Sequence, residues 1–182
     1  MSEGVNLVVI GTGDVPTTFD NLSKISAYNS IFINCDTDMS EYAAVLQQYV
    51  ASGGNMYFSD LAYPGVTEAF PDKVKFGSGS TSVGKVNAAL ENANLVTYLG
   101  KSTVEIEFDL SSWEPIESVA SGVSTFVSGD TSPLGGTVDA PITVGWKQGS
   151  GGCVFYTSYH IEGASTGSDQ EKVLKYLILN IN

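Results

Sequence analysis

Residues 153–162 read Cys-Val-Phe-Tyr-Thr-Ser-Tyr-His-Ile-Glu, an apolar and aromatic run that ends in the only histidine of the 182-residue chain. Such a run predicts a buried β-strand. The histidine, His160, follows the run directly, and Glu162 stands two positions later. Because imidazole is the side chain that titrates near neutral pH, His160 is a candidate for proton transfer or ligand binding. The stretch therefore predicts a core strand with two candidate site residues at its end.

The residues before this stretch alternate between short apolar runs and a helical pattern. Residues 6–10, 30–34 and 55–59 are apolar runs of strand length. Between the second and third runs, apolar residues recur at helical spacing over 42–50, and Asp38 is a candidate N-cap for that helix. Strand, helix, glycine and strand is the order of a βαβ unit, so we expect these strands to lie parallel in one sheet.

The middle of the chain follows a different pattern. Over residues 103–110 apolar side chains alternate with acidic ones, which predicts a strand with an acidic exposed face. Residues 116–119 and 123–127 predict further short strands, whereas the spacing of apolar residues over 86–98 favours a helix. We therefore expect residues 83–138 to form a β-rich insertion or side layer on the parallel core.

The last part of the chain returns to the core pattern. Apolar runs at 141–147 and 152–159 flank a glycine-rich turn and predict an antiparallel hairpin. Ser168 and Glu171 have the spacing of a capping box, which predicts the start of a final helix. We expect the inward face of that helix to comprise Val173, Leu174, Leu177 and Ile178. Together these patterns predict a single α/β domain over residues 1–182, a three-layer sandwich built on a mostly parallel sheet.

Acidic residues dominate the charge of the chain. Twenty Asp and Glu stand against eight Lys, and the formal net charge is −12. Nucleic acids and anionic membranes are therefore excluded as main partners, because binding to phosphate groups needs a cationic surface. No apolar stretch reaches the roughly 20 residues of a membrane-spanning helix, so no membrane insertion is expected. The N-terminus lacks the basic region of a signal peptide, but the abundance of Gly, Ser and Thr favours an extracellular or cell-surface location over a cytoplasmic one.

The two cysteines, Cys35 and Cys153, are too few for a disulfide framework or for a zinc site built from thiolates. Each lies in or beside a predicted core strand, where cysteine most often packs as a small apolar residue. The sequence leaves open whether the two thiols pair.

Polar side chains gather at the predicted ends of the core strands. Ligands of parallel α/β sheets bind outside the carboxyl ends of the strands, and these ends carry Asp14, Asp36, Ser59, Asp60 and His160. The three aspartates could hold a hard divalent cation through carboxylate oxygens. Their spacing matches no specific metal motif, so the sequence assigns no metal ligands.

No cofactor is expected. Gly11-Thr12-Gly13 follows the first apolar run, but it lacks the third glycine of a dinucleotide fingerprint and the lysine of a phosphate loop. A tight turn is the simpler interpretation of these glycines.

A nucleophilic site is an alternative at the same strand ends. Ser59 or Asp60 would act as the nucleophile with His160 as the base, and Glu162 would orient the imidazole ring. Ser59 is not flanked by the small residues of a Gly-x-Ser-x-Gly elbow. A strand that ends at Ser59 and Asp60 with only local turn contacts is the simpler interpretation.

Three blocks of the sequence, residues 28–35, 49–58 and 154–162, resemble the class I glutamine amidotransferase-like superfamily. The resemblance is to its non-canonical branch, which includes trehalose-utilisation-type domains, and it implies a flavodoxin-like core. His160 and Glu162 match the spacing of the His and Glu in that family's catalytic triad, with Ile161 in place of Pro. The family's nucleophile position falls near Ser59 or Asp60 and holds no cysteine, whereas Cys35 lies one strand earlier. The resemblance therefore implies the fold together with a degenerate or repurposed site.

These observations lead to one main expectation and two alternatives. The main expectation is a non-catalytic amidotransferase-like module of a larger, surface or secreted protein that binds a small molecule or a partner protein. The first alternative is a hydrolase that uses Ser59 or Asp60 with His160 and Glu162. The second is a binding domain that depends on a divalent cation held by Asp14, Asp36 and Asp60.

Overall fold

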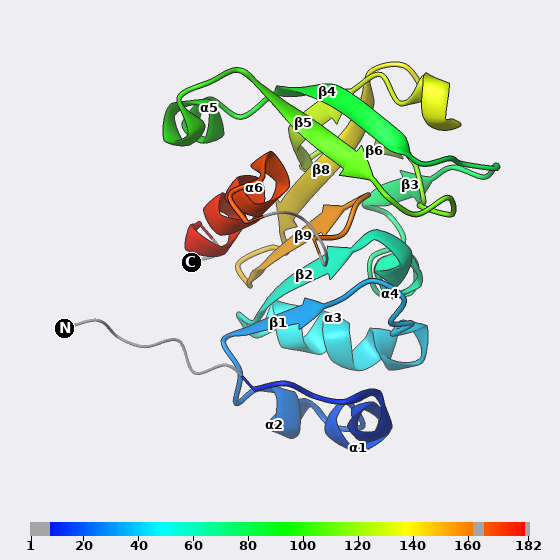
Figure 1. Cartoon of the computed structure of the whole chain (residues 1–182). Coiled ribbons are helices and arrows are strands. Elements are labelled where there is room, and N and C mark those ends of the chain that lie inside the picture. Colours follow the sequence, from blue (N-terminus) through cyan, green and yellow to red (C-terminus); the bar gives the residue numbers. More distant parts are fainter. Residues whose placement is uncertain (1–7, 162–165, 181–182) are drawn as a thin grey trace.

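A mixed seven-stranded sheet forms the centre of the protein (Figure 1). The computed structural model describes residues 8–161 and 166–180. The strand order across the sheet is β1-β2-β9-β8-β7-β4-β5, and β3 pairs with β6 in a separate two-stranded sheet. The strands are β1 (Ser30–Ile33), β2 (Asn55–Ser59), β3 (Val74–Phe76), β4 (Gly84–Leu90), β5 (Thr103–Phe108), β6 (Ile116–Val119), β7 (Ser124–Gly129), β8 (Ala140–Lys147) and β9 (Cys153–Thr157).

One end of the sheet is parallel and the rest is antiparallel. Strands β1, β2 and β9 run parallel, with Ile31 beside Met56 and Met56 beside Val154. Strand β9 then pairs antiparallel with β8, which confirms the predicted hairpin, and β7, β4 and β5 continue the antiparallel order. The parallel arrangement expected from the sequence is therefore found in the three strands at one end of the sheet, β1, β2 and β9.

Helices cover both faces of this sheet. They are α1 (Val15–Thr18), α2 (Leu22–Ile25), α3 (Ala43–Ala51), α4 (Tyr63–Ala69), α5 (Ala93–Leu99) and α6 (Asp169–Leu179). One apolar core contains Leu46 of α3, Val66 of α4 and Phe58 of β2. A second core joins Leu95 of α5 and Leu177 of α6 to the strands. The predicted α/β sandwich with helices on either side of the sheet is thus confirmed.

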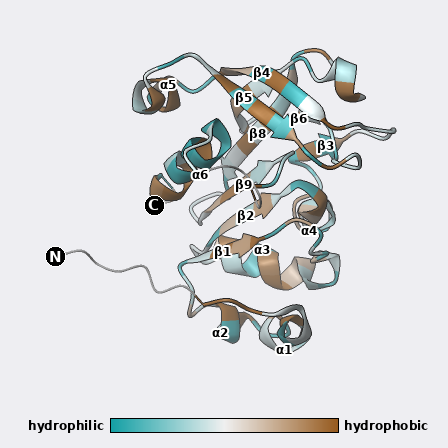
Figure 2. Cartoon of the chain, viewed as in Figure 1, coloured by the Kyte–Doolittle hydropathy of each residue, from teal (hydrophilic) through white to brown (hydrophobic). Residues whose placement is uncertain are grey.

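The region 83–138 adds strands to the main sheet and one strand to the small sheet. Strands β4, β5 and β7 lie in the main sheet, while β6 pairs with β3. In β5 the buried and exposed residues alternate as predicted, and Figure 2 shows the matching bands of hydrophobic and hydrophilic residues along β4 and β5.

The helix predicted over residues 86–98 is wrong for residues 86–92 and confirmed for residues 93–98. Strand β4 ends at Leu90, and α5 begins at Ala93 after its N-cap, Asn92. Val86, Ala88 and Leu90 are buried on alternate positions because β4 pairs with β5. Their period of two therefore reflects long-range pairing, which overrides a local spacing that also fits a helix.

The first predicted strand, over residues 6–10, is not formed where the structure describes it. Residues 8–10 have no regular secondary structure, and Val8 and Val9 are 51% and 84% exposed. Residues 6 and 7 lie outside the described residues.

The two predicted helix starts have different outcomes. The Ser168 hydroxyl accepts a hydrogen bond from the Glu171 backbone N–H, so the predicted cap of α6 is confirmed. Asp38 instead accepts from the Ser40 N–H in a turn, and α3 begins five residues after it, at Ala43. On α6, Val173 and Leu177 face inward as predicted and Leu174 packs partly against the core, but Tyr176 replaces the 39% exposed Ile178.

Candidate functional site

The candidate site begins at the sharp turn that follows β2. Asp60 has a φ of 45°, a left-handed conformation that costs a non-glycine residue roughly 1–2 kcal/mol. It opens a short 3-10 helix, η3 (Asp60–Ala62), that leads into α4. The hydroxyl of the buried Tyr156 donates a hydrogen bond of 3.0 Å to the Asp60 carbonyl oxygen. The core therefore holds this strand-to-helix turn in place.

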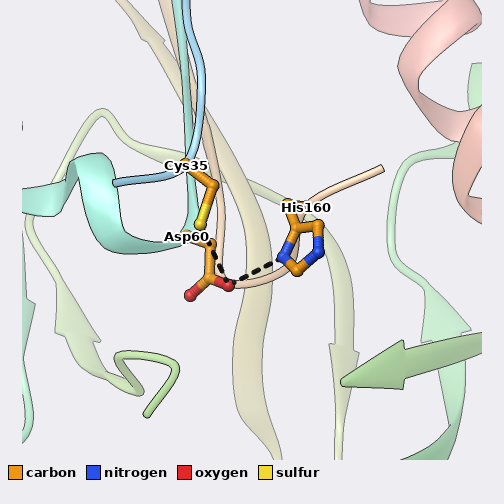
Figure 3. Close-up of side chains that lie close together, drawn as sticks. All are labelled: Cys35, Asp60 and His160. Carbon is orange, nitrogen blue, oxygen red and sulfur yellow. Dashed lines mark hydrogen bonds and ion pairs between the residues drawn. The ribbon is translucent and has the colours of Figure 1, made fainter. Parts of the chain in front are cut away.

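The Asp60 carboxylate contacts side chains from both neighbouring strand ends (Figure 3). Its Oδ2 lies 3.1 Å from His160 Nδ1 and accepts a hydrogen bond from the Cys35 thiol at 3.8 Å. Cys35 follows β1 and His160 follows β9, so three adjacent parallel strands supply the group. The Asp60 side chain is only 2% exposed. Its second oxygen, Oδ1, is buried and has no hydrogen-bond partner in the described part of the chain.

His160 lies between two carboxylates. Its Nε2 is 3.2 Å from Oδ1 of Asp109, the residue directly after β5. Strands β1 and β5 are the two edge strands of the sheet. The residues that follow them, Cys35 and Asp109, therefore both lie at this site. Asp109 is half exposed, whereas His160 is 10% exposed. The imidazole therefore has a buried carboxylate on one side and a more solvated one on the other.

Gln170 in the first turn of α6 ties the His160 loop to β5. Its side-chain amide donates to the backbone carbonyl oxygens of Glu107 and His160, at 3.1 and 3.3 Å. Its amide oxygen accepts from the Glu107 N–H. The buried side chain of Gln170 therefore connects the backbone of His160 to the end of β5.

Burial and negative charge determine the electrostatics of the site. Burial raises the pKa of Asp60 above its usual value, although the hydrogen bond and charge of His160 and the contact with Cys35 oppose the shift. Burial also raises the pKa of Glu114, and the charge of Asp60 adds to that shift. The pKa of Tyr156 is raised chiefly by burial and then by the charges of Asp60 and Glu114. Glu114 is therefore part of the same electrostatic environment.

A surface pocket of about 550 Å³ lies beside the site. Glu114 lines it together with Tyr63, Lys75 and Phe76. Cys35, Asp60 and His160 do not line this pocket, so Glu114 is the residue that links it to the charges of the site.

The other residues proposed from the sequence lie elsewhere. Ser59 is buried, and within the described residues its hydroxyl makes no hydrogen bond to His160. Asp14, in the 3-10 helix η1 (Thr12–Asp14), and Asp36, in a left-handed turn after β1, are both exposed and do not belong to the Cys35, Asp60 and His160 group. Glu162 lies outside the described residues.

Sequence reasoning missed three members of this environment: Cys35, Asp109 and Glu114. Cys35 was interpreted as a core thiol, and it forms no disulfide with Cys153, which begins β9 at the opposite edge of the parallel strands. Asp109 does end the alternating acidic run over 103–110, and this position at a strand end was the signal available for it. For Glu114 no sequence signal was available.

Comparison with known proteins places the fold in one class. No family model matches the chain, and no curated protein sequence matches it significantly. Among solved structures, the mmIFT52 N-terminal domain has a TM-score of 0.62 at 11% identity, over 88% of this chain and 80% of that one. A ThuA-like protein from Bacteroides uniformis has a TM-score of 0.56 at 16% identity, with 84% and 69% covered. A glutamine amidotransferase has a TM-score of 0.54 at 11% identity, with 87% and 82% covered.

These likenesses define the fold, which is α/β and of the glutamine amidotransferase-like, flavodoxin-like class. The expected fold class is thereby confirmed. Among the helices in the described residues, none has the length and apolar character needed to cross a membrane.

Proposed function

We propose that this domain is a glutamine amidotransferase-like module that binds a small ligand at the Asp60 site and does not hydrolyse glutamine. The observation that carries the proposal is the position of Asp60. It occupies the strained strand-to-helix turn after β2, beside His160, where the sequence resemblance puts the nucleophile of true amidotransferases. A carboxylate at this turn cannot form the thioester that a cysteine forms with glutamine.

The cost of this arrangement supports a binding role. A buried oxygen without a hydrogen bond costs roughly 1–3 kcal/mol, and Asp60 Oδ1 is such an atom in the described part of the chain. The left-handed backbone of Asp60 adds strain at the same residue. Costs of this kind concentrate at ligand sites, because the ligand completes the missing contacts.

The charges around the site favour a particular class of ligand. Asp60, Asp109 and Glu114 are all acidic, and the cavity beside them has one cationic residue, Lys75, which pairs with Glu117. A metal cation, or a small molecule with amine or hydroxyl donors, would satisfy these oxygens. An anionic ligand would be repelled.

We propose that the module forms part of a larger protein. The structural likeness to a domain described as N-terminal supports this, since that fold there forms one part of a longer chain.

The test combines an activity assay with a binding screen. Thermal melts of the wild type, Asp60→Asn and the exposed control Asp14→Asn are measured with a fixed panel of amines, amino acids, sugars and divalent cations. We expect at least one compound to raise the Tm of the wild type and of Asp14→Asn but not of Asp60→Asn. Glutamine hydrolysis that depends on Asp60, or a panel with no stabilising member, would overturn the proposal.

Hydrolysis through Asp60 is the second candidate function, and the two contacts of the His160 ring favour it. Asp60 would attack an electrophilic carbon and expel the leaving group, forming an ester. His160, oriented by Asp109, would then take a proton from a water molecule that attacks the ester carbonyl and regenerates Asp60. Ser59 is the weaker nucleophile candidate because it makes no hydrogen bond to His160 among the described residues.

Isotope labelling separates the two functions. A single turnover of an activated alkyl substrate, p-nitrobenzyl bromide, in H₂¹⁸O would form the Asp60 ester with loss of bromide, and hydrolysis of that ester would leave ¹⁸O in the peptide that carries Asp60 if Asp60 is the nucleophile. Under the binding proposal no label enters that peptide, and mass spectrometry of a protease digest reads the outcome.

A further inference from the structure

We propose that Cys35, Asp60 and His160 form a binding site for a transition-metal ion of the Zn²⁺ type, with a coordination position left for a further ligand. The inference deepens the proposed function and rests on it, since it names the chemical class of the ligand. The three ligand atoms, one each from the thiol, carboxylate and imidazole, lie within 4.8 Å of one another.

The distances match a tetrahedral centre. Zinc binds sulfur at about 2.3 Å, nitrogen at about 2.0–2.1 Å and carboxylate oxygen at about 2.0–2.2 Å. At tetrahedral angles these bond lengths separate S from O by about 3.6 Å and N from O by about 3.4 Å. Cys35 Sγ lies 3.8 Å from Asp60 Oδ2, and His160 Nδ1 lies 3.1 Å from the same oxygen. Both distances to Asp60 Oδ2 are within a few tenths of an ångström of these tetrahedral separations, and the sulfur and nitrogen lie within 4.8 Å of each other.

The donor atoms select the type of metal. Thiolate and imidazole favour zinc, copper and related ions, whereas Ca²⁺ and Mg²⁺ take six or more oxygen ligands. The group therefore differs from the hard-cation site considered for Asp14, Asp36 and Asp60, because it includes one of those aspartates and replaces the other two with sulfur and nitrogen.

Two further observations point to a ligand at this group. Asp60 Oδ1 is buried and has no partner within the described residues, so the carboxylate retains an unused oxygen in a side chain that is 2% exposed. Asp109 contacts Nε2 of His160, the ring nitrogen remote from the group. A carboxylate behind a histidine is the usual arrangement that fixes the ring and its tautomer for metal binding.

Glu114 links the charges of this group to the neighbouring pocket. Its carboxyl is near enough to Asp60 to respond to that charge, and it also lines the neighbouring pocket. Three protein ligands with a remaining position are typical of zinc sites that bind a substrate or water, in contrast to closed structural sites with four.

The experiment uses the full chain after removal of bound metal with EDTA. Titration with Zn²⁺ measures affinity by calorimetry, and titration with Co²⁺ reports thiolate coordination through a sulfur-to-cobalt charge-transfer band. We expect Cys35→Ser and His160→Gln to weaken Zn²⁺ binding by more than about 100-fold, and Asp109→Asn to weaken it about 10–100-fold. The matched controls Cys153→Ser and Asp36→Asn should retain wild-type affinity, and Cys153→Ser should retain the cobalt band.

Three outcomes would overturn the metal site. These are wild-type affinity for Zn²⁺ no tighter than millimolar, unchanged affinity in Cys35→Ser, and a cobalt band that survives in Cys35→Ser. Circular dichroism and thermal melting without metal verify the fold of each variant. If a variant does not fold, the presence or absence of the thiolate-to-cobalt band in the wild type still decides whether the metal site exists. If the metal site fails but a metal-free compound of the panel still raises the Tm of the wild type and not of Asp60→Asn, the proposed function stands. If no ligand of either kind binds, both fail.

Discussion

The parallel and antiparallel parts of the sheet contribute differently to the site. In the parallel part, β1, β2 and β9 end at the same edge, and the residues after them supply Cys35, Asp60 and His160. In the antiparallel part, Asp109 after β5 contacts this group through the His160 ring. Parallel strands thus bring together the ligand atoms, and the antiparallel part supplies the carboxylate that orients one of them. The pairing order makes β5 run in the same direction as β9, so its C-terminal end lies at the same edge as the ends of the three parallel strands.

The largest effect we expect tests the core of the parallel part. Phe58 of β2 is fully buried, and Phe58→Ala should destabilise the protein by about 3–5 kcal/mol because it leaves a cavity. Phe32 of β1, in the same part but 39% exposed, provides the matched control. Urea unfolding of both variants measures the difference, and equal losses would show that the burial of Phe58 does not decide its contribution to stability.

A smaller effect is expected where α6 joins the two parts. Gln170→Ala removes three hydrogen bonds to Glu107 and His160, and we expect a loss of about 2–3 kcal/mol, because buried backbone groups lose their partners. Gln47→Ala, which removes a single bond to the Ala69 carbonyl, is the control and should cost about 1 kcal/mol. A Gln170 variant as stable as its control would show that this side chain does not hold the two parts together.

The smallest effect concerns the ion pair at the start of α6. Burial alone would raise the pKa of Asp169, but the hydrogen bond and charge of Lys101 and the Glu105 N–H outweigh it and leave the pKa below its usual value. The stabilisation from Asp169 is therefore present above about pH 4, the unfolded pKa, and is lost as the pH falls through the lower folded pKa. Asp169→Asn should cost about 1 kcal/mol at pH 7.

Unfolding of this variant and the wild type at pH 7 and at pH 3 measures that dependence. The gap between the two proteins should narrow at the lower pH. Asp20→Asn, which breaks an exposed pair with Lys24, should cost about 0.5 kcal/mol or less and serves as the control. A gap that widens in acid would contradict a lowered pKa for Asp169 in the folded protein.

The sequence predicted strands in both parts of the sheet where their signal is local, and it missed β4, where the signal is not local. The runs at 30–34 and 55–59 became β1 and β2, because apolar runs bounded by turn residues are local signals of buried strands. Strand β4 was predicted as a helix, since Val86 and Leu90 fit both periods and only the pairing with β5 decides between them. The pairing that decides β4 is remote in sequence, whereas the alternating pattern of β5 was a sufficient local signal for that strand.

The same contrast holds at the site. Asp60 and His160 were proposed because they follow predicted strands, and the structure brings these two side chains together. Asp109 was interpreted as part of an exposed acidic face, because nothing local shows that the end of β5 returns to the His160 loop. Cys35 was assigned to the core on the general preference of cysteine for burial, although it also follows a strand.

The left-handed backbone at Asp60 limits which residues can replace it. Glycine, asparagine and aspartate tolerate this conformation, whereas β-branched residues do not. Asparagine would keep the turn and remove only the charge, while valine or isoleucine would also disrupt the backbone. Random substitution at this position should therefore yield folded variants from a narrow group of amino acids. Within that group, loss of ligand binding can be separated from loss of the fold.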